Sequence, residues 1–318
     1  MNENQKSHSF EKNLKKMIET FIKAEKNKKE NDLKYISWIK TICSSNFNLV
    51  SDISFYINDK KINHEIRENI IKILKKLILF EDKNIINQLN ENEKILNYFS
   101  KYLMNHDLNK ISENFIFLFC KILKKKNYNK ILNEKIIKKL FLSLEIINNE
   151  ELIFNVVWKL IKINFYCYNN NDDDNKNNKN IFIKVFNEIK LKRVFIEFLL
   201  NVLNKEIINE KKIKQILLCL FTILNEFNEF VFYSNDFDIF IDIFIKNLEI
   251  TSNFEIKLFF LKIFNRIISN FPLDKNKIFR KNEIIILLKE LNDENFNNDD
   301  NNKEIKMFIN DILIKINS

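Results

Sequence analysis

The chain has 318 residues, of which 46% are apolar, and a formal net charge of +9. It contains no glycine and a single proline, Pro272. Phosphate-binding loops, dinucleotide-binding turns and nucleophile elbows need glycine at tight turns or points of close backbone approach, so these enzyme motifs are excluded in their standard forms.

The N-terminal region is polar. The first ten residues, MNENQKSHSF, lack the apolar stretch of a signal peptide, and we expect residues 1–9 to form a short tail. The longest apolar runs, such as FIFLFC at 115–120, are far shorter than the roughly 18 residues that a membrane span requires. We therefore expect a cytoplasmic protein without a membrane span.

One apolar pattern recurs along the chain. Large apolar residues spaced by four, three, one and three positions form a single stripe on an α-helix. The pattern fits five segments, which we call the template segments; they start at Ile66, Ile111, Leu152, Ile213 and Ile256. Each is followed by a second periodic segment, at residues 96–105, 135–145, 192–203, 237–248 and 282–292.

The spacing of the template segments indicates a repeat protein. Helical units of about 40 to 47 residues are typical of HEAT and armadillo arrays, and three of the four separations fit this length. The longer separation contains YNNNDDDNKNNKN, and we expect residues 169–180 to form a disordered Asn/Asp-rich loop. The sequence predicts an all-α fold, an armadillo/HEAT-like right-handed superhelix of stacked helical repeats, as a single domain over residues 1–318.

Two helix starts carry a capping pattern. Ser252 with Glu255 precedes the stripe of Ile256, and Asn148 with Glu151 precedes that of Leu152. We expect Ser252 and Asn148 to cap these helices.

The residues that usually carry chemistry are scattered. Cysteines 43, 120, 167 and 219 form no C-x-x-C motif, and three lie in apolar helical runs, which indicates reduced core residues. Histidines 8, 64 and 106 form no metal-binding pair. With no nucleophile–base pair in view, we expect a protein that is not an enzyme and needs no metal or cofactor.

Several segments resemble the Mo-25 family, also called calcium-binding protein 39. They are KSHSFEKNLKKM at 6–17, NLVSDISFYINDKKINHEIRENIIKIL at 48–74, NFEIKLFFLKIFNRIISNF at 253–271, FRKNEIIILLKELNDENF at 279–296 and EIKMFINDILIKI at 304–316. The resemblance follows nearly the whole chain in order and spacing, although residues 108–200 match by periodicity alone. The Asn-rich insertion and the loss of glycines depart from the family, and no calcium site is indicated.

The resemblance implies a non-catalytic scaffold. Such a protein holds a Sterile-20-type kinase or pseudokinase on a concave surface and stabilises its active conformation. In some members a C-terminal pocket also grips a Trp-Glu-Phe-like tail. By this reading the protein is monomeric by itself and takes no small-molecule substrate.

The same resemblance places candidate partner-binding residues on the later repeats. They are Lys211, Lys212, Lys214, Ile241, Arg280 and Lys281. Phe259 is a further candidate on other grounds, because it lies off the core stripe of its helix and aromatic side chains are common among the residues that dominate binding. The tail pocket would lie near Ile241, but Glu283 replaces a family lysine there. Each residue also has a plainer interpretation, because lysines at helix starts usually face solvent, Ile241 lies in a dense apolar run, and Phe259 can pack on the neighbouring repeat.

Two other functions stay open. Asn69, Asn114 and Asn155 occupy the same place in three template segments, as in armadillo peptide- and cargo-binding adaptors, which hold an extended peptide with a row of asparagines. The net charge could instead mark a nucleic-acid or phosphoinositide surface. The lysines are interleaved with acidic residues along the chain, which disfavours nucleic acid as a partner.

Overall fold

The structure, a computed structural model, describes residues 64–79, 83–169, 180–205, 209–226, 234–270, 278–293 and 299–317, with isolated positions 19, 53, 54, 57, 58, 62 and 232. Every regular element within these residues is a helix. The predicted tail at 1–9 and residues 170–179 of the predicted loop lie outside the described residues.

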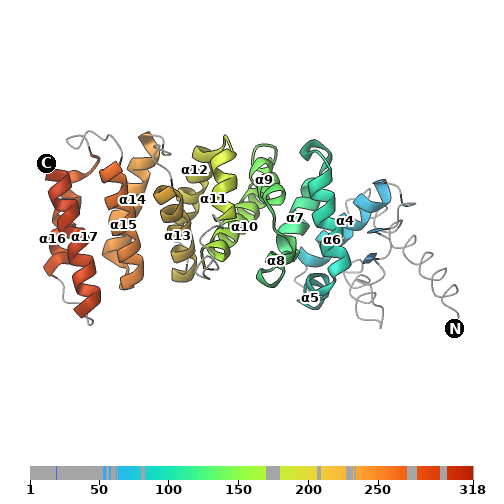
Figure 1. The fold of residues 1–318 in the computed structure, drawn as a ribbon, viewed down its shortest axis with the longest axis horizontal. Helices are drawn as coiled ribbons and strands as arrows, with labels where there is room; N and C mark the ends of the chain where they lie inside the picture. The colour runs from blue at the N-terminus through green and yellow to red at the C-terminus, as the bar shows by residue number, and fades with distance from the viewer. Residues whose placement is uncertain are drawn as a thin grey trace. The chain divides into compact units, whose positions relative to one another are not determined.

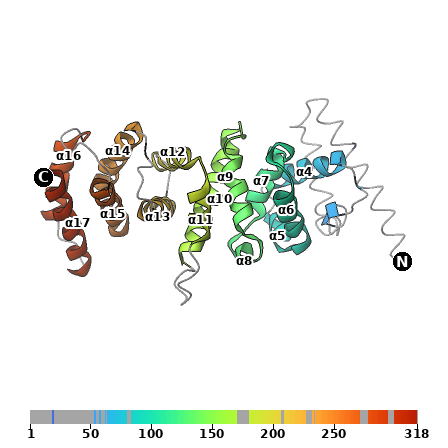
Figure 2. The same ribbon diagram turned by 45° about the horizontal axis from the view of Figure 1, so that its top comes forward.

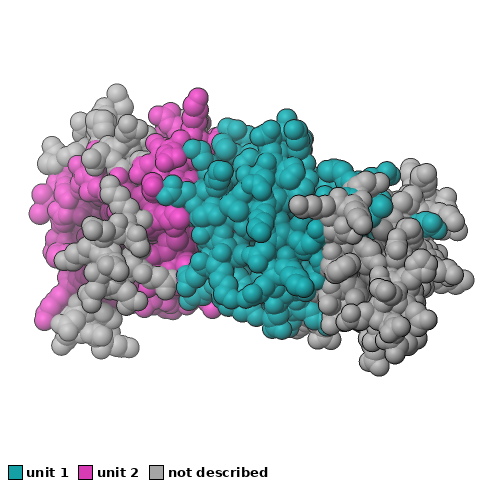
Figure 3. Space-filling model, turned by 45° about the vertical axis from the view of Figure 1, so that its right-hand side comes forward, with its two compact units in different colours: residues 1–156 teal, residues 157–318 magenta. Residues whose placement is uncertain are grey.

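The chain divides into two compact units, residues 1–156 and residues 157–318 (Figure 3). Helix α10, Glu150–Asn169, crosses the boundary between them. The organisation of residues 1–318 as one domain stays a prediction.

The first unit contains helices stacked in two layers. Helix α4 packs against α7 in one layer, α6 packs against α9 in the other, and α5 contacts both α6 and α7 (Figure 1). The helices are α4 His64–Leu79, α5 Lys83–Glu91, α6 Glu93–Asn105, α7 Glu113–Ile122, α8 Tyr128–Ile131 and α9 Glu134–Ser143. Short 3-10 helices, Leu108–Lys110 and Lys125–Asn127, join some of them.

The second unit repeats this plan more regularly. Helices α13, α15 and α17 pack side by side in one layer, and α12, α14 and α16 form the other (Figure 1, Figure 2). The bounds are α11 Ile181–Glu188, α12 Lys192–Leu203, α13 Glu210–Glu226, α14 Ser234–Ile250, α15 Phe254–Asn270, α16 Lys281–Asp293 and α17 Asp299–Asn317. The template segments that start at Ile213 and Ile256 therefore form α13 and α15 in one layer. The second periodic segments that follow the template segments form helices of the other layer.

The template stripes form the core between the layers. In α15 all five predicted positions, Ile256, Phe260, Ile263, Phe264 and Ile267, are fully buried. Burying each such side chain contributes about 1.5–3 kcal/mol, so the stripe is the main force that holds α15 in place. In α13 three predicted positions, Leu217, Leu220 and Leu224, are fully buried, whereas Ile213 and Phe221 at the edge of the stripe are only half-buried.

Asparagine side chains cap many of the helices. The Asn253 side chain accepts hydrogen bonds from Glu255 N and Ile256 N (3.1 and 3.3 Å), and Asn149 accepts one from Leu152 N (2.9 Å). The caps therefore lie one residue after the predicted Ser252 and Asn148, because Asn is at least as good a cap as Ser and fits the observed helix starts. Asparagines also cap α6, α9, α11 and α13, through Asn92, Asn133, Asn180 and Asn209.

The predicted fold class is confirmed: the protein is an all-α, armadillo/HEAT-like array of stacked helical repeats. The cysteines of the described residues, Cys120, Cys167 and Cys219, are buried, as expected of core residues. No helix that the structure describes is both long and apolar enough to cross a membrane.

Candidate partner-binding surface

Helices α13, α15 and α17 carry a row of side chains that runs across the layer from one helix to the next. The row alternates aromatic rings with charged groups, and most of its members are half-buried. We call it the cross-helix row; its residues are Lys214, Phe221, Glu255, Phe259, Lys262, Glu304, Phe308, Asp311 and Lys315.

Aromatic contacts form the apolar part of the row. Phe221 of α13 meets Phe259 of α15 edge to face, with ring centroids 6.1 Å apart. One repeat further, the ammonium of Lys262 lies over the ring of Phe308, 5.6 Å from its centroid. Aromatic pairs and cation–π contacts each contribute about 0.5–1.5 kcal/mol, so they help fix the spacing of the three helices.

Ion pairs form the charged part. Lys214 of α13 pairs with Glu255 of α15, and Lys262 of α15 pairs with Glu304 of α17 at 2.8 Å. On α17 itself Lys315 pairs with Asp311 at 2.5 Å, and the Nδ2 of Asn265 donates to the same carboxylate at 2.8 Å. The hydrogen bond from Lys315 is the main cause that lowers the pKa of Asp311.

The charges of the row balance, because each of its three lysines has a carboxylate partner. A balanced row has no excess charge with which to attract a polyanion, and this argues against a nucleic-acid surface here. Exposed ion pairs of this kind contribute little to stability, about 0–1 kcal/mol each. They can be exchanged for contacts with a partner at small cost.

Two of the basic residues predicted on α13 contact the rest of the protein. Lys214 belongs to the cross-helix row, and the ammonium of Lys212 lies 5.4 Å from the ring centroid of Trp158 on α10. Lys211, which precedes both in the sequence, is exposed at the start of the helix. The structure thus brings Lys214 and Phe259 together in one row, and their binding role stays a prediction.

The predicted tail pocket near Ile241 is not formed by that side chain. Ile241 has no exposed surface and belongs to the core, because α12, α15 and α16 pack against α14. Phe259 combines its two interpretations: it packs on the neighbouring repeat through Phe221, yet it stays half-exposed.

The side chains of the predicted partner-binding residues Arg280 and Lys281 make contacts within the chain. The guanidinium of Arg280 donates to Asp242 of α14 (2.6 Å) and to Glu283, and these contacts, first that with Glu283, raise the pKa of Arg280. Lys281 donates to the backbone oxygen of Ile316 at 2.9 Å. A partner carboxylate would therefore have to displace these contacts.

The asparagines at equivalent template positions do not form one row of available amides. Asn114 accepts a hydrogen bond from Lys75 of α4 (2.9 Å), and Asn155 donates to the backbone oxygen of Glu151 in its own helix (2.9 Å). Asn69 is buried. An extended peptide could therefore form hydrogen bonds with only some of these three asparagines.

Lys262, Glu304 and Phe308 were missed by the sequence analysis, although a signal for them exists. Residues 255–259 read EIKLF and residues 304–308 read EIKMF, so α17 repeats the start of α15. Aligning the two segments pairs Phe259 with Phe308, and both rings contact the preceding helix of the layer. This internal repeat would have placed α17 in the same layer.

Within the described residues, no group of three or more His, Cys, Asp or Glu side chains could hold a metal ion.

Comparison with protein families gives one match. The model of the SPIN90/Ldb17 leucine-rich domain matches residues 149–284, less than half of the chain. This span runs from the start of α10 into α16 and includes α13 and α15. It overturns the resemblance to the Mo-25 family, which rested on the order and spacing of helical segments, a pattern that different helical repeat families share. No curated protein matches the chain.

Solved structures with similar helical arrays include designed proteins. The designed armadillo repeat protein YIII(Dq.V1)4CPAF, solved in complex with the peptide (KR)4, is 15% identical and has a TM-score of 0.36; the match covers 84% of this chain and 100% of that one. An engineered protein from a structural genomics consortium is 12% identical, with a TM-score of 0.38 and coverage of 89% and 68%. With TM-scores this low, neither carries an argument about function.

Proposed function

We propose that the chain is a non-catalytic protein-binding adaptor whose partner contacts the cross-helix row. The observation that carries the proposal is the row itself, a continuous series of half-exposed aromatic rings and paired charges on three adjacent helices. Stacked helical repeats commonly use such extended surfaces to bind other proteins.

The composition of the row suits a protein partner. Aromatic side chains are enriched at protein interfaces, and a ring that is already packed on one side loses little conformational entropy when a partner covers the other. Phe221, Phe259 and Phe308 are held in this way. The lysine–carboxylate pairs around them offer hydrogen-bonding groups of both signs, which favours a mixed polar and apolar partner surface over a polyanion.

Charge reversal on the row tests the proposal. The double variant Lys214→Glu and Lys262→Glu places carboxylates beside Glu255 and Glu304. The matched control, Lys190→Glu and Lys289→Glu, makes the same change in net charge at two exposed lysines of the same unit. Circular dichroism and thermal unfolding establish that both variants fold.

The measurement is quantitative affinity purification of the three proteins at physiological salt, followed by cross-linking of the recovered complex. We expect the wild type and the control to recover a protein partner in near-stoichiometric amount. The row variant should recover at least about tenfold less of this partner. In the recovered complex, the partner should cross-link to α13, α15 or α17. Equal recovery by a folded row variant would overturn the proposal.

A further inference from the structure

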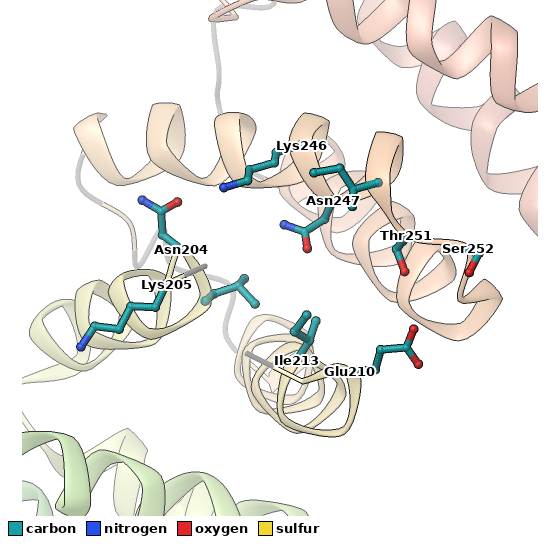
Figure 4. A pocket seen from close by; sticks show the side chains of 10 residues that line it. Asn204, Lys205, Glu210, Ile213, Lys246, Asn247, Thr251 and Ser252 are labelled. Carbon is teal, nitrogen blue, oxygen red and sulfur yellow. The ribbon is translucent and has the colours of Figure 1, made fainter. Parts of the chain in front are cut away.

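A pocket lies between two successive repeats of the second unit and adjoins the Lys214 end of the cross-helix row. The pocket has a volume of about 460 Å³, within the range of roughly 300–1,000 Å³ typical of ligand sites. It is bounded by the end of α12, the start of α13, the last turns of α14 and the link to α15 (Figure 4). Its lining residues are Leu203, Asn204, Lys205, Glu210, Ile213, Lys246, Asn247, Ile250, Thr251 and Ser252.

The charges in this pocket are separated. Figure 4 shows Lys246 extending toward Asn204 and Lys205, while Glu210 lies on the other side beside Thr251 and Ser252. Among the described residues, the exposed Lys246 ammonium makes no hydrogen bond or ion pair. One side of the pocket therefore favours a negative group, and the other side disfavours one.

The polar lining is partly fixed in place. Asn247 donates to the backbone oxygen of Ile243 at 2.8 Å, which fixes the orientation of its amide. Glu210 accepts a hydrogen bond from Asn253 at 2.8 Å, and the backbone N–H of Asn253 donates to the hydroxyl of Thr251 at 3.1 Å. A ligand meets groups that are already positioned, which lowers the entropic cost of binding.

An apolar contact completes the site. Ile250 is 73% exposed, more than any other large apolar side chain that the structure describes, and it lies at the pocket together with Ile213 and Leu203. An exposed isoleucine next to a hollow is a ready anchor for an aliphatic side chain of a partner.

We propose that this pocket binds a short segment of a partner protein in which an acidic side chain lies next to an aliphatic one. The acidic group meets Lys246, the aliphatic group covers Ile250, and Glu210 rejects a second acidic group at the far side. The inference goes beyond the proposed function, because it adds a separate site with a chemical preference of its own.

Selection from a random heptapeptide phage library tests this preference, with four folded full-length proteins as baits. They are the wild type, Lys246→Glu, the matched control Lys289→Glu, and the row variant Lys262→Glu, which is used alone here because Lys214 adjoins the pocket residue Ile213. The wild type, the control and the row variant should enrich peptides that join acidic and aliphatic residues. Lys246→Glu should lose the enrichment of acidic residues.

Fluorescence polarisation with the most enriched peptide then measures affinity. We expect Lys246→Glu to weaken binding about tenfold and Ile250→Ser about fivefold, whereas Lys289→Glu leaves it unchanged. The pocket is the wrong site if Lys246→Glu selects the same peptides as its control, if the wild type enriches no acidic residue, or if the row variant abolishes selection. The last result would leave the cross-helix row as the site of peptide binding, so the two proposals fail separately.

Discussion

Phe221 on α13 and Phe259 on α15 pack edge to face, with ring centroids 6.1 Å apart and ring planes at 70°. Both rings are half-buried, and they come from helices of successive repeats. The pair therefore has two roles open to it: it joins two repeats, and it presents aromatic surface beside the ion pair of Lys214 and Glu255.

The structural role of this pair can be measured by substitution. Phe259→Ala should lower the free energy of unfolding by about 1–2 kcal/mol, less than the roughly 3–5 kcal/mol expected for Phe260→Ala, because Phe260 is fully buried. Adding Phe221→Ala to Phe259→Ala should reveal a coupling energy of about 0.5–1.5 kcal/mol. Urea unfolding of five proteins, the wild type, the single variants Phe221→Ala, Phe259→Ala and Phe260→Ala, and the double variant, measures these values. Equal losses for Phe259→Ala and Phe260→Ala would contradict the assigned burial.

Arg280 holds a backbone conformation that usually belongs to glycine. Its φ is 53°, in the left-handed region, which costs a residue with a Cβ roughly 1 kcal/mol. In a chain without glycine, contacts of its guanidinium with Asp242 and Glu283 offset this strain. Both Arg280→Gly and Arg280→Ala remove these contacts, but only Ala keeps the strain.

Arg280→Gly should therefore be more stable than Arg280→Ala by about 1 kcal/mol. Thermal unfolding of the two variants under identical conditions checks the order. A glycine variant that unfolds at the lower temperature would show that the entropy of glycine in the unfolded chain outweighs the backbone strain.

The sequence predicts the helices well, because a helix that is buried on one side has apolar residues at regular intervals along the sequence. The stripe of α15, including Phe260 and Ile263, is buried as predicted. It predicts the surface poorly, since the half-buried side of a helix depends on its neighbours: Phe221 fits the core stripe of α13 but turns toward Phe259. Pocket residues such as Lys246 carry no sequence signal, because α12, α13 and α14 meet there only after folding.

The family assignment failed for a related reason. Helix order and spacing are set by the packing of repeats, so unrelated repeat families can share them. Arg280 and Lys281 matched a binding pattern in position, but in the structure their side chains are engaged by Asp242, Glu283 and Ile316. A matching position in the sequence therefore does not establish which groups the side chain contacts in the folded protein.

Asn164 on α10 is a polar residue in an apolar place. It is fully buried, and neither its amide nitrogen nor its amide oxygen has a hydrogen-bond partner among the residues that the structure describes. An unsatisfied buried amide costs about 1–3 kcal/mol, so Asn164→Leu, which keeps the number of non-hydrogen atoms and the branching of the side chain, should raise the free energy of unfolding by about 1–2 kcal/mol. Asn164→Ala, which removes the amide but leaves a cavity, serves as the control. A destabilised Leu variant would indicate that the amide binds an internal water.

Cys167 should make the second unit less stable at alkaline pH. Burial raises the pKa of its thiol from 9.0 to about 11, although a backbone hydrogen bond with Phe182 acts in the opposite direction. The folded state therefore keeps the proton while the unfolded chain loses it above about pH 9, so this stabilisation is fully present below pH 9 and is lost as the pH rises toward 11. Between about pH 8 and pH 10 the expected loss is about 1 kcal/mol.

Urea unfolding, followed by Trp158 fluorescence in a Trp38→Phe background, measures this loss within the second unit. Cys167→Ala removes the ionising group and should flatten the pH dependence by about 1 kcal/mol over that range. Val185→Ala is a matched control, because Val185 is equally enclosed in the core and has no proton to lose, so it should lower stability by the same amount at every pH. If Cys167→Ala keeps the full pH dependence of the wild type, the thiol does not ionise in the unfolding transition and other groups, such as buried tyrosines, are responsible.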